Sequence, residues 1–160
     1  MESAAALMLT SALATAELCP APLDTGTGEP QLCRVANAQR IETPYFSIHV
    51  EADQYVGIDR DGRRLRVQPT LARDHAYLQI EAIESIDLPN WPDCRKVTTT
   101  TEEMVTWHDC HAVVHGMFER RLAARLRDQH VLIAYRYSAP ATPLAPSLER
   151  MTQSVRILAR

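Results

Sequence analysis

Most signatures of catalysis are missing from this sequence. Its 160 residues contain no Gly-x-Ser-x-Gly nucleophile elbow, no glycine-rich phosphate-binding loop and no His-Glu-x-x-His zinc motif. Internal repeats and low-complexity tracts are absent, and no apolar run reaches the roughly 20 residues that a membrane-spanning helix needs. These absences argue against a hydrolase or a membrane-spanning protein. We therefore expect a non-enzymatic protein that needs no cofactor.

Lysine is nearly absent as well. Lys96 is the only one, which we attribute first to composition bias and only second to function. The net charge of −3 at pH 7 provides no global attraction to nucleic acid or to an anionic membrane. A hydrophobic fraction of 46% and a charged fraction of 23% are ordinary for a soluble globular protein, and the length suits one domain with a buried core.

Four cysteines lie in two local pairs, Cys19 with Cys33 and Cys94 with Cys110. An even count in local pairs predicts two disulfides and an oxidising compartment. Four cysteines allow three connectivities, and their spacing alone does not choose among them.

The N-terminal segment supports export. Residues 4–16 form a small, apolar stretch with the length of a signal-peptide core, and Ala14-Thr15-Ala16 matches a cleavage site. A basic N-terminal region is missing because Glu2 is the only charge, so an amphipathic helix is the alternative. Together with the cysteines, residues 1–16 predict a signal peptide and a periplasmic or secreted protein.

The stretch from Cys94 to Cys110 predicts a disulfide-stapled hairpin. If the chain reverses at residues 101–103, Cys94 faces Cys110 and Thr98 faces Thr106. This register places the apolar residues of the stretch on the opposite face (Val97, Val105 and Trp107). A short helix is the alternative, because the threonines and the glutamates that follow them also fit a capping box.

Alternating apolar residues predict strands at 45–50, 55–59, 65–67, 76–83, 113–126 and 130–138. Asp61-Gly62 predicts a hairpin turn, and Gly116 predicts a bulge or bend inside the strand 113–126. A helix is the alternative for residues 118–127. Residues 145–158 predict a closing amphipathic helix, with Glu149 and Arg150 facing water and four apolar residues on the other side (Leu148, Met151, Val155 and Leu158).

These elements predict an α+β fold: an antiparallel β-sheet packed by helices, including a C-terminal amphipathic helix, with two disulfides. Residues 1–16 are the signal peptide in this scheme. Residues 17–44 form a disulfide-tied N-terminal loop segment, and residues 45–160 form a single α+β domain.

Both ends of that domain resemble the PsbP-like α/β sandwich family. Phe46-Ser47-Ile48-His49-Val50 is similar to the strand that opens such domains, and Ser154-Val155-Arg156-Ile157 is similar to their closing signature. Between them, Glu51 stands where proline is usual, and Tyr55 stands roughly where tryptophan is. The resemblance covers residues 45–158 and implies an antiparallel sheet packed by helices with a non-enzymatic binding or adaptor role. It transfers no functional residue.

The segment 108–115 is the clearest candidate for metal chemistry. It contains His108, Asp109, Cys110, His111 and His115, and imidazole, carboxylate and thiolate are all zinc ligands. On a strand, however, His108 points to the face opposite His111 and His115, and a disulfide consumes Cys110. We therefore prefer solvent-facing polar residues, with a metal site at His108, His111 and His115 as the alternative.

Aromatic and basic residues suggest a protein partner instead. Two arginine clusters would form a basic patch for an acidic protein surface if they were adjacent (residues 60, 63, 64 and 66, and residues 120, 121, 125 and 127). Trp91 lies in a proline-rich loop, which is typical of an interface anchor. The predicted partner-binding residues are Trp91, Arg63, Arg64, Arg120 and Arg121.

The function predicted from these features is that of an exported protein-binding module. Immunity-type inhibition of a secreted antibacterial toxin and an envelope adaptor role both fit it, and no nucleic-acid-binding module is recognised. A metal-binding envelope protein that uses the segment 108–115 is the alternative.

Overall fold

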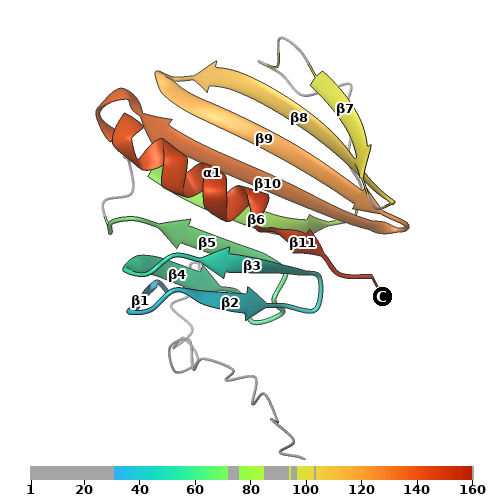
Figure 1. Ribbon diagram of the computed structural model, residues 1–160, viewed down its shortest axis with the longest axis horizontal. Helices are drawn as coiled ribbons and strands as arrows, with labels where there is room; N and C mark the ends of the chain where they lie inside the picture. Colours follow the sequence, from blue (N-terminus) through green and yellow to red (C-terminus); the bar gives the residue numbers. More distant parts are fainter. Residues whose placement is uncertain (1–30, 72–75, 85–93, 95–96, 103, 160) are drawn as a thin grey trace, which may run out of the picture.

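The computed structural model describes residues 31–71, 76–84, 94, 97–102 and 104–159, and it is mostly antiparallel β-sheet (Figure 1). Strands account for 60% of the structure and helical residues for 13%. The predicted α+β class is therefore wrong. Within the described residues there is one short α-helix, α1 (Ala145–Gln153), preceded by a 3-10 helix, η2 (Ala139–Leu144). None of these helical segments has the length and apolar character that crossing a membrane requires.

The main layer is an eight-stranded sheet in the order β1-β4-β5-β6-β10-β9-β8-β7, in which every neighbouring pair is antiparallel. Its strands are β1 (Cys33–Val35), β4 (Gln54–Ile58), β5 (Arg64–Gln68), β6 (Ala76–Ile83), β7 (Val97–Glu102), β8 (Val105–Val114), β9 (Met117–Leu126) and β10 (Gln129–Ser138).

The second layer consists of α1 and a three-stranded sheet, both lying over the same face of the large sheet (Figure 1). The small sheet has the order β11-β3-β2, with β2 (Gln39–Glu42), β3 (Phe46–Val50) and β11 (Arg156–Ile157). The predicted packing by helices is thus replaced by one helix and a second sheet. We call the covered side of the large sheet the helix face and the other side the outer face.

The core fills the space between the two layers. β6 shows why the large sheet has one buried face: Ala76, Leu78, Ile80 and Ala82 are buried, and the residues between them are only partly covered. The second layer contributes fully or almost fully buried side chains from β3 and α1 (Phe46, Ile48, Val50, Leu148 and Met151). Because the same spacing recurs on β5 and β10, the apolar stripes of five elements meet in one core.

Most of the strands predicted from alternation are confirmed. β3, β6 and β10 lie where the sequence places them, and the β4–β5 hairpin turns at Gly62, whose φ is +66°. Residues 117–126 form a strand and not the alternative helix. The closing helix is confirmed but ends at Gln153, since Arg156 and Ile157 instead pair with Ser47 and Phe46 of β3.

The region around Gly116 differs from its prediction. Residues 113–126 form the end of one strand and the whole of the next, joined by a tight turn at His115 and Gly116. Both turn residues have positive φ, +49° and +76°, which is the conformation of the two-residue turns that suit the twist of a hairpin. Gly116 therefore marks a reversal and not a bulge.

The β7–β8 hairpin exists, but its predicted register is wrong. Glu102 pairs with Val105 and Thr99 with His108, so the chain reverses at residues 103 and 104 and the register moves by three residues. Met104, at φ +66°, allows this two-residue turn, which closes the hairpin more tightly than the predicted reversal at 101–103. Cys110 consequently pairs with Val97 in the strand register and not with Cys94.

Cys94 and Cys110 are nevertheless joined by a disulfide, with their Cα atoms 5.9 Å apart. Two disulfides were expected, and the described residues show this single one. Cys19, the predicted partner of Cys33, lies outside the described residues, as do the predicted signal peptide and Trp91. The part of segment 17–44 that the structure describes includes β1 and β2.

Candidate binding cleft

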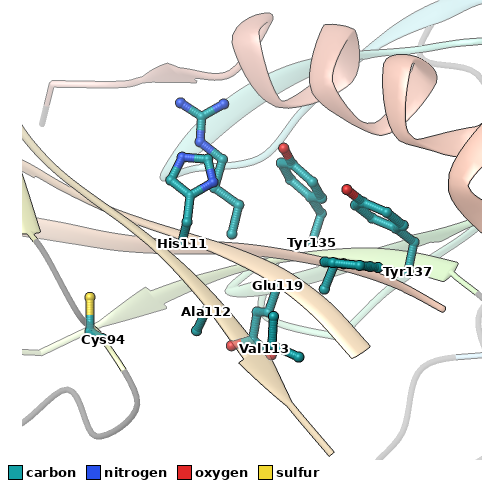
Figure 2. A pocket seen from close by; sticks show the side chains of 9 residues that line it. Cys94, His111, Ala112, Val113, Glu119, Tyr135 and Tyr137 are labelled. Atoms are coloured by element: carbon teal, nitrogen blue, oxygen red, sulfur yellow. The ribbon is translucent and has the colours of Figure 1, made fainter. Parts of the chain in front are cut away.

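A pocket of about 620 Å³ opens over β8, β9 and β10. The side chains of His111, Tyr135 and Tyr137 extend from the strands towards the side on which α1 lies (Figure 2). Such a volume lies within the range of small-ligand and side-chain pockets. Its lining residues are Cys94, His111, Ala112, Val113, Phe118, Glu119, Arg120, Tyr135 and Tyr137.

One end of this cleft is aromatic. Phe118 on β9 lies opposite Tyr137 on β10, with their stacked ring centroids 5.3 Å apart, and Tyr135 follows at 6.4 Å from Tyr137. We call these three residues the aromatic row. Phe118 is 41% exposed, and its β8 partner Val113 is 64% exposed. The row therefore begins at the protein surface and leads inward.

The other end is polar. Arg120 donates from Nε to Asp109 Oδ1 (3.0 Å) and from Nη2 to Asp109 Oδ2 (2.7 Å), and its Nη1 bonds Glu149 Oε1 on α1. The Tyr135 hydroxyl donates to Glu149 Oε2 at 2.5 Å. These four residues, the Arg120 network, connect β8, β9 and β10 to the helix. His111 lies at its rim, with Nε2 3.6 Å from Asp109 Oδ1.

Mutual hydrogen bonding sets the charge states of the network. Hydrogen bonds to Asp109 raise the pKa of Arg120 against the opposing effect of burial. Burial disfavours the charged form of Glu149, but hydrogen bonds from Arg120 and Tyr135 outweigh it and lower the pKa of that carboxyl. Burial and the hydrogen bond to Glu149 raise the pKa of Tyr135 to about 12. Near pH 7 these shifts keep Arg120 and Glu149 charged and Tyr135 neutral.

These groups are engaged with one another and not poised for a reaction. A catalytic acid or base needs a pKa near the working pH, whereas the shifts of Arg120, Glu149 and Tyr135 all move away from neutrality. Among the residues that the structure describes, no group of three or more His, Cys, Asp or Glu side chains could hold a metal ion.

The candidate metal-binding histidines are not brought together. His108 lies on the outer face, where its Nδ1 is 3.0 Å from Thr99 Oγ1. His111 points to the helix face, and His115 occupies the β8–β9 turn. Alternation along β8 separates the first two, as expected for a strand.

The predicted arginine surface is also divided. Arg120 and Arg121 are consecutive on β9 and point to opposite faces of the sheet. Arg121 and Arg136 both pair with Glu119, whose side chain is only 1% exposed on the outer face. The other two predicted arginines lie on or next to β5, where Arg64 pairs with Glu81 at 2.8 Å and Arg63 lies over the ring of Tyr45.

Comparison with models of protein families and with curated proteins gives no match. The PsbP-like resemblance therefore stays a prediction.

Sequence reasoning missed Phe118, Tyr135 and Glu149 as site residues. Tyr135 and Tyr137 lie at positions i and i+2 of one strand, and this spacing predicts two aromatic rings on the same face of the sheet. Glu149 had no such signal. Its predicted position facing water is wrong, because the charged residue beside the apolar stripe of α1 meets Arg120 of the sheet.

Proposed function

We propose that the protein is a non-enzymatic binding module that recognises another protein through the aromatic row, and that it acts after export to the periplasm or the cell exterior. An immunity-type inhibitor of a secreted toxin or an envelope adaptor is the biological role that fits this activity. The observation that carries the proposal is the exposed pair of Val113 and Phe118 at the mouth of the 620 Å³ cleft.

The aromatic row has the properties of an interface anchor. Aromatic residues dominate the energetics of protein interfaces when they line a pocket that a partner side chain can fill. Phe118 offers an exposed ring, and the stacked Tyr137 and Tyr135 are held in place by their neighbours on the strands. An apolar side chain of the partner can therefore bury itself without first ordering this surface.

The charge at the inner end of the aromatic row determines which partner residue can lie next to that apolar side chain. Asp109 and Glu149 together carry one more negative charge than Arg120 neutralises, and all three lie at the inner end of the row. A basic partner residue is favoured at this end, and an acidic one is repelled. The partner segment we propose thus carries an apolar side chain next to a lysine or arginine.

The test is site-specific photo-crosslinking in cells of the organism that produces the protein, with a benzophenone amino acid at position 118. The matched control carries the same group at Leu71, which is 59% exposed and lies outside the cleft. We expect one protein to be captured from position 118 and not from position 71. The captured protein is then purified, and Phe118→Ala should weaken its binding about tenfold or more.

Two results would overturn the proposal. One is equal capture from both positions, which means that the cleft does not select a partner. The other is unchanged affinity of Phe118→Ala for the purified partner. Thermal unfolding of each variant shows that the folded state is retained.

A further inference from the structure

β7 is an unusually open edge of the large sheet. It is the last strand in the sheet order, and within the described residues no strand pairs with its outer side. Thr98, Thr99, Thr100, Thr101 and Glu102 are all exposed. Its four consecutive threonines favour the extended conformation, because β-branched side chains suit a pleated strand.

The other sheet edges are shorter or carry charge. β1 has three residues, and its Arg34 pairs with Asp53 at 2.7 Å. In the small sheet, β11 has two residues, and the four-residue β2 carries Arg40 and Glu42. Proteins generally protect exposed edges with lysine, proline, bulges or short strands, since unpaired main-chain groups recruit other strands. The six residues of β7 contain no proline and no lysine, and Glu102 is their only charge.

The β7–β8 register identifies the main-chain groups that face outward. Glu102 and Val105 flank the two-residue turn and form the closing pair, which exchanges hydrogen bonds in such hairpins. Hydrogen-bonded and non-hydrogen-bonded pairs alternate along an antiparallel ladder. Thr98 and Thr100 therefore form main-chain hydrogen bonds with β8, whereas Thr99 and Thr101 direct their N–H and C=O groups away from it.

We propose that β7 pairs with β7 of a second copy of this chain, antiparallel and across a two-fold axis at Thr99. In this register Thr99 faces Thr99 of the other copy, and Thr98 faces its Thr100. Both pairs are threonine with threonine, a favourable cross-strand combination. Glu102 lies beyond the axis and does not meet its own copy, so no like charges are opposed. The two large sheets become one continuous sheet.

The dimer leaves the aromatic row accessible. β7 pairs with β8 only as far as Cys110, and Val113 and Phe118 lie beyond that point. This inference is therefore independent of the proposed function, and either can fail without the other.

Sedimentation velocity of the purified chain tests the proposal, because it follows mass as a function of concentration. We expect the 18.0 kDa chain to convert to a species of twice that mass across the micromolar to submillimolar range. Thr99→Pro should remain monomeric with an unchanged β7–β8 hairpin, because its lost N–H points away from β8. Thr99→Lys should also remain monomeric, since two ammonium groups meet at the axis, whereas Thr99→Val should still dimerise.

A cysteine scan tests the register. Paired Cα atoms at the axis lie about 5.5 Å apart, which suits a disulfide. Thr99→Cys should form a disulfide-linked dimer under mild oxidation, and Thr101→Cys should not. The proposal is overturned if the unmodified chain stays monomeric throughout, if Thr99→Pro and Thr99→Lys dimerise as well as the unmodified chain, or if both cysteine variants crosslink equally.

Discussion

At the residue scale, the direction of a side chain decides its role. Arg120 and Arg121 are neighbours in sequence, yet one binds Asp109 and Glu149 beneath the helix and the other binds Glu119 on the outer face. Strand alternation alone separates them. Composition identified Arg120 and Arg121 as members of one cluster, but the two bind different acidic residues.

The Tyr135 hydroxyl provides a spectroscopic test of the Arg120 network. Its pKa is raised from 10.0 to about 12 by burial and by the hydrogen bond to Glu149. Because the neutral phenol is favoured in the folded state, the stability it contributes is complete below pH 10 and is lost as the pH rises towards 12. The difference in tyrosinate absorbance between the unmodified chain and Tyr135→Phe should show one ionisation near pH 12. An ionisation near pH 10 would contradict the network.

Two glycines with similar backbone angles differ in their surroundings. Gly62 and Gly116 both have positive φ, but a Cβ at Gly62 would lie 2.9 Å from Pro44 Cδ, whereas nothing lies within 4 Å of one at Gly116. We expect Gly116→Ala to cost about 1 kcal/mol of unfolding free energy from backbone strain. Gly62→Ala should cost at least about 1 kcal/mol more, because the steric contact adds to the same strain. Urea denaturation of both variants measures the difference, and equal costs would refute the packing at Pro44.

At the scale of elements, two groups of polar contacts attach α1 to the rest of the fold. The Arg120 network joins the helix to β8, β9 and β10. At the start of the helix, the hydroxyl of Ser147 donates to Glu51 Oε2 at 2.5 Å, and Arg150 Nε donates to Glu51 Oε1 at 2.7 Å. The Arg120 network is partly buried and the Arg150–Glu51 pair is exposed, so the two should differ in their contribution to stability.

Arg120→Met should destabilise the protein by about 2–3 kcal/mol, because it leaves Asp109 and Glu149 partly buried without their cation. Adding Glu149→Gln should recover part of that loss, since it removes one of the unpaired charges. Arg150→Met is the matched control in the exposed pair and should change stability little. Chemical denaturation of the four proteins measures these effects. A loss for Arg120→Met no larger than that for Arg150→Met would show that the network is not structural.

At the scale of the whole molecule, acid should weaken the polar contacts that attach α1 to the rest of the fold. The pKa of Glu149 and the pKa of Glu51 both lie below the ordinary value of 4.5, Glu51 chiefly because Arg150 donates a hydrogen bond to it. A lowered folded-state pKa stabilises the fold above pH 4.5, and this stability is lost as the pH falls through the folded value. The free energy of unfolding should therefore fall below pH 4.5, and Glu149→Gln should show a smaller fall. Identical acid profiles would contradict the assigned shifts.

Export can be tested on the intact chain. Expression with the native N-terminus, followed by intact-mass analysis under non-reducing conditions, should show loss of residues 1–16 and oxidation of all four cysteines. The prediction rests on the cysteine pairs, because disulfides generally form and persist in oxidising compartments. A full-length protein with free thiols would overturn the compartment prediction.

Local pattern by itself determined the strands with a buried face and the start of the closing helix. Ala76–Ile83 alternates so regularly that one face must be buried, and Asp61-Gly62 joins two such strands. The hairpin predicted between Cys94 and Cys110 indicated their disulfide, although its register was wrong by three residues. In each case the signal is local, because strand periodicity and turn chemistry involve only neighbouring residues.

Only the tertiary structure decided the layers and the cleft. The two residues of β11 are too few to show a period, yet their pairing with β3 ends the helix and completes the small sheet. The β7–β8 register depended on a positive φ at Met104, a residue type that rarely adopts it. Glu149 and Arg120 are 29 residues apart in the chain, and they meet because the helix packs across the strands. Long-range packing of this kind leaves no local pattern, so only the folded chain defines the candidate site.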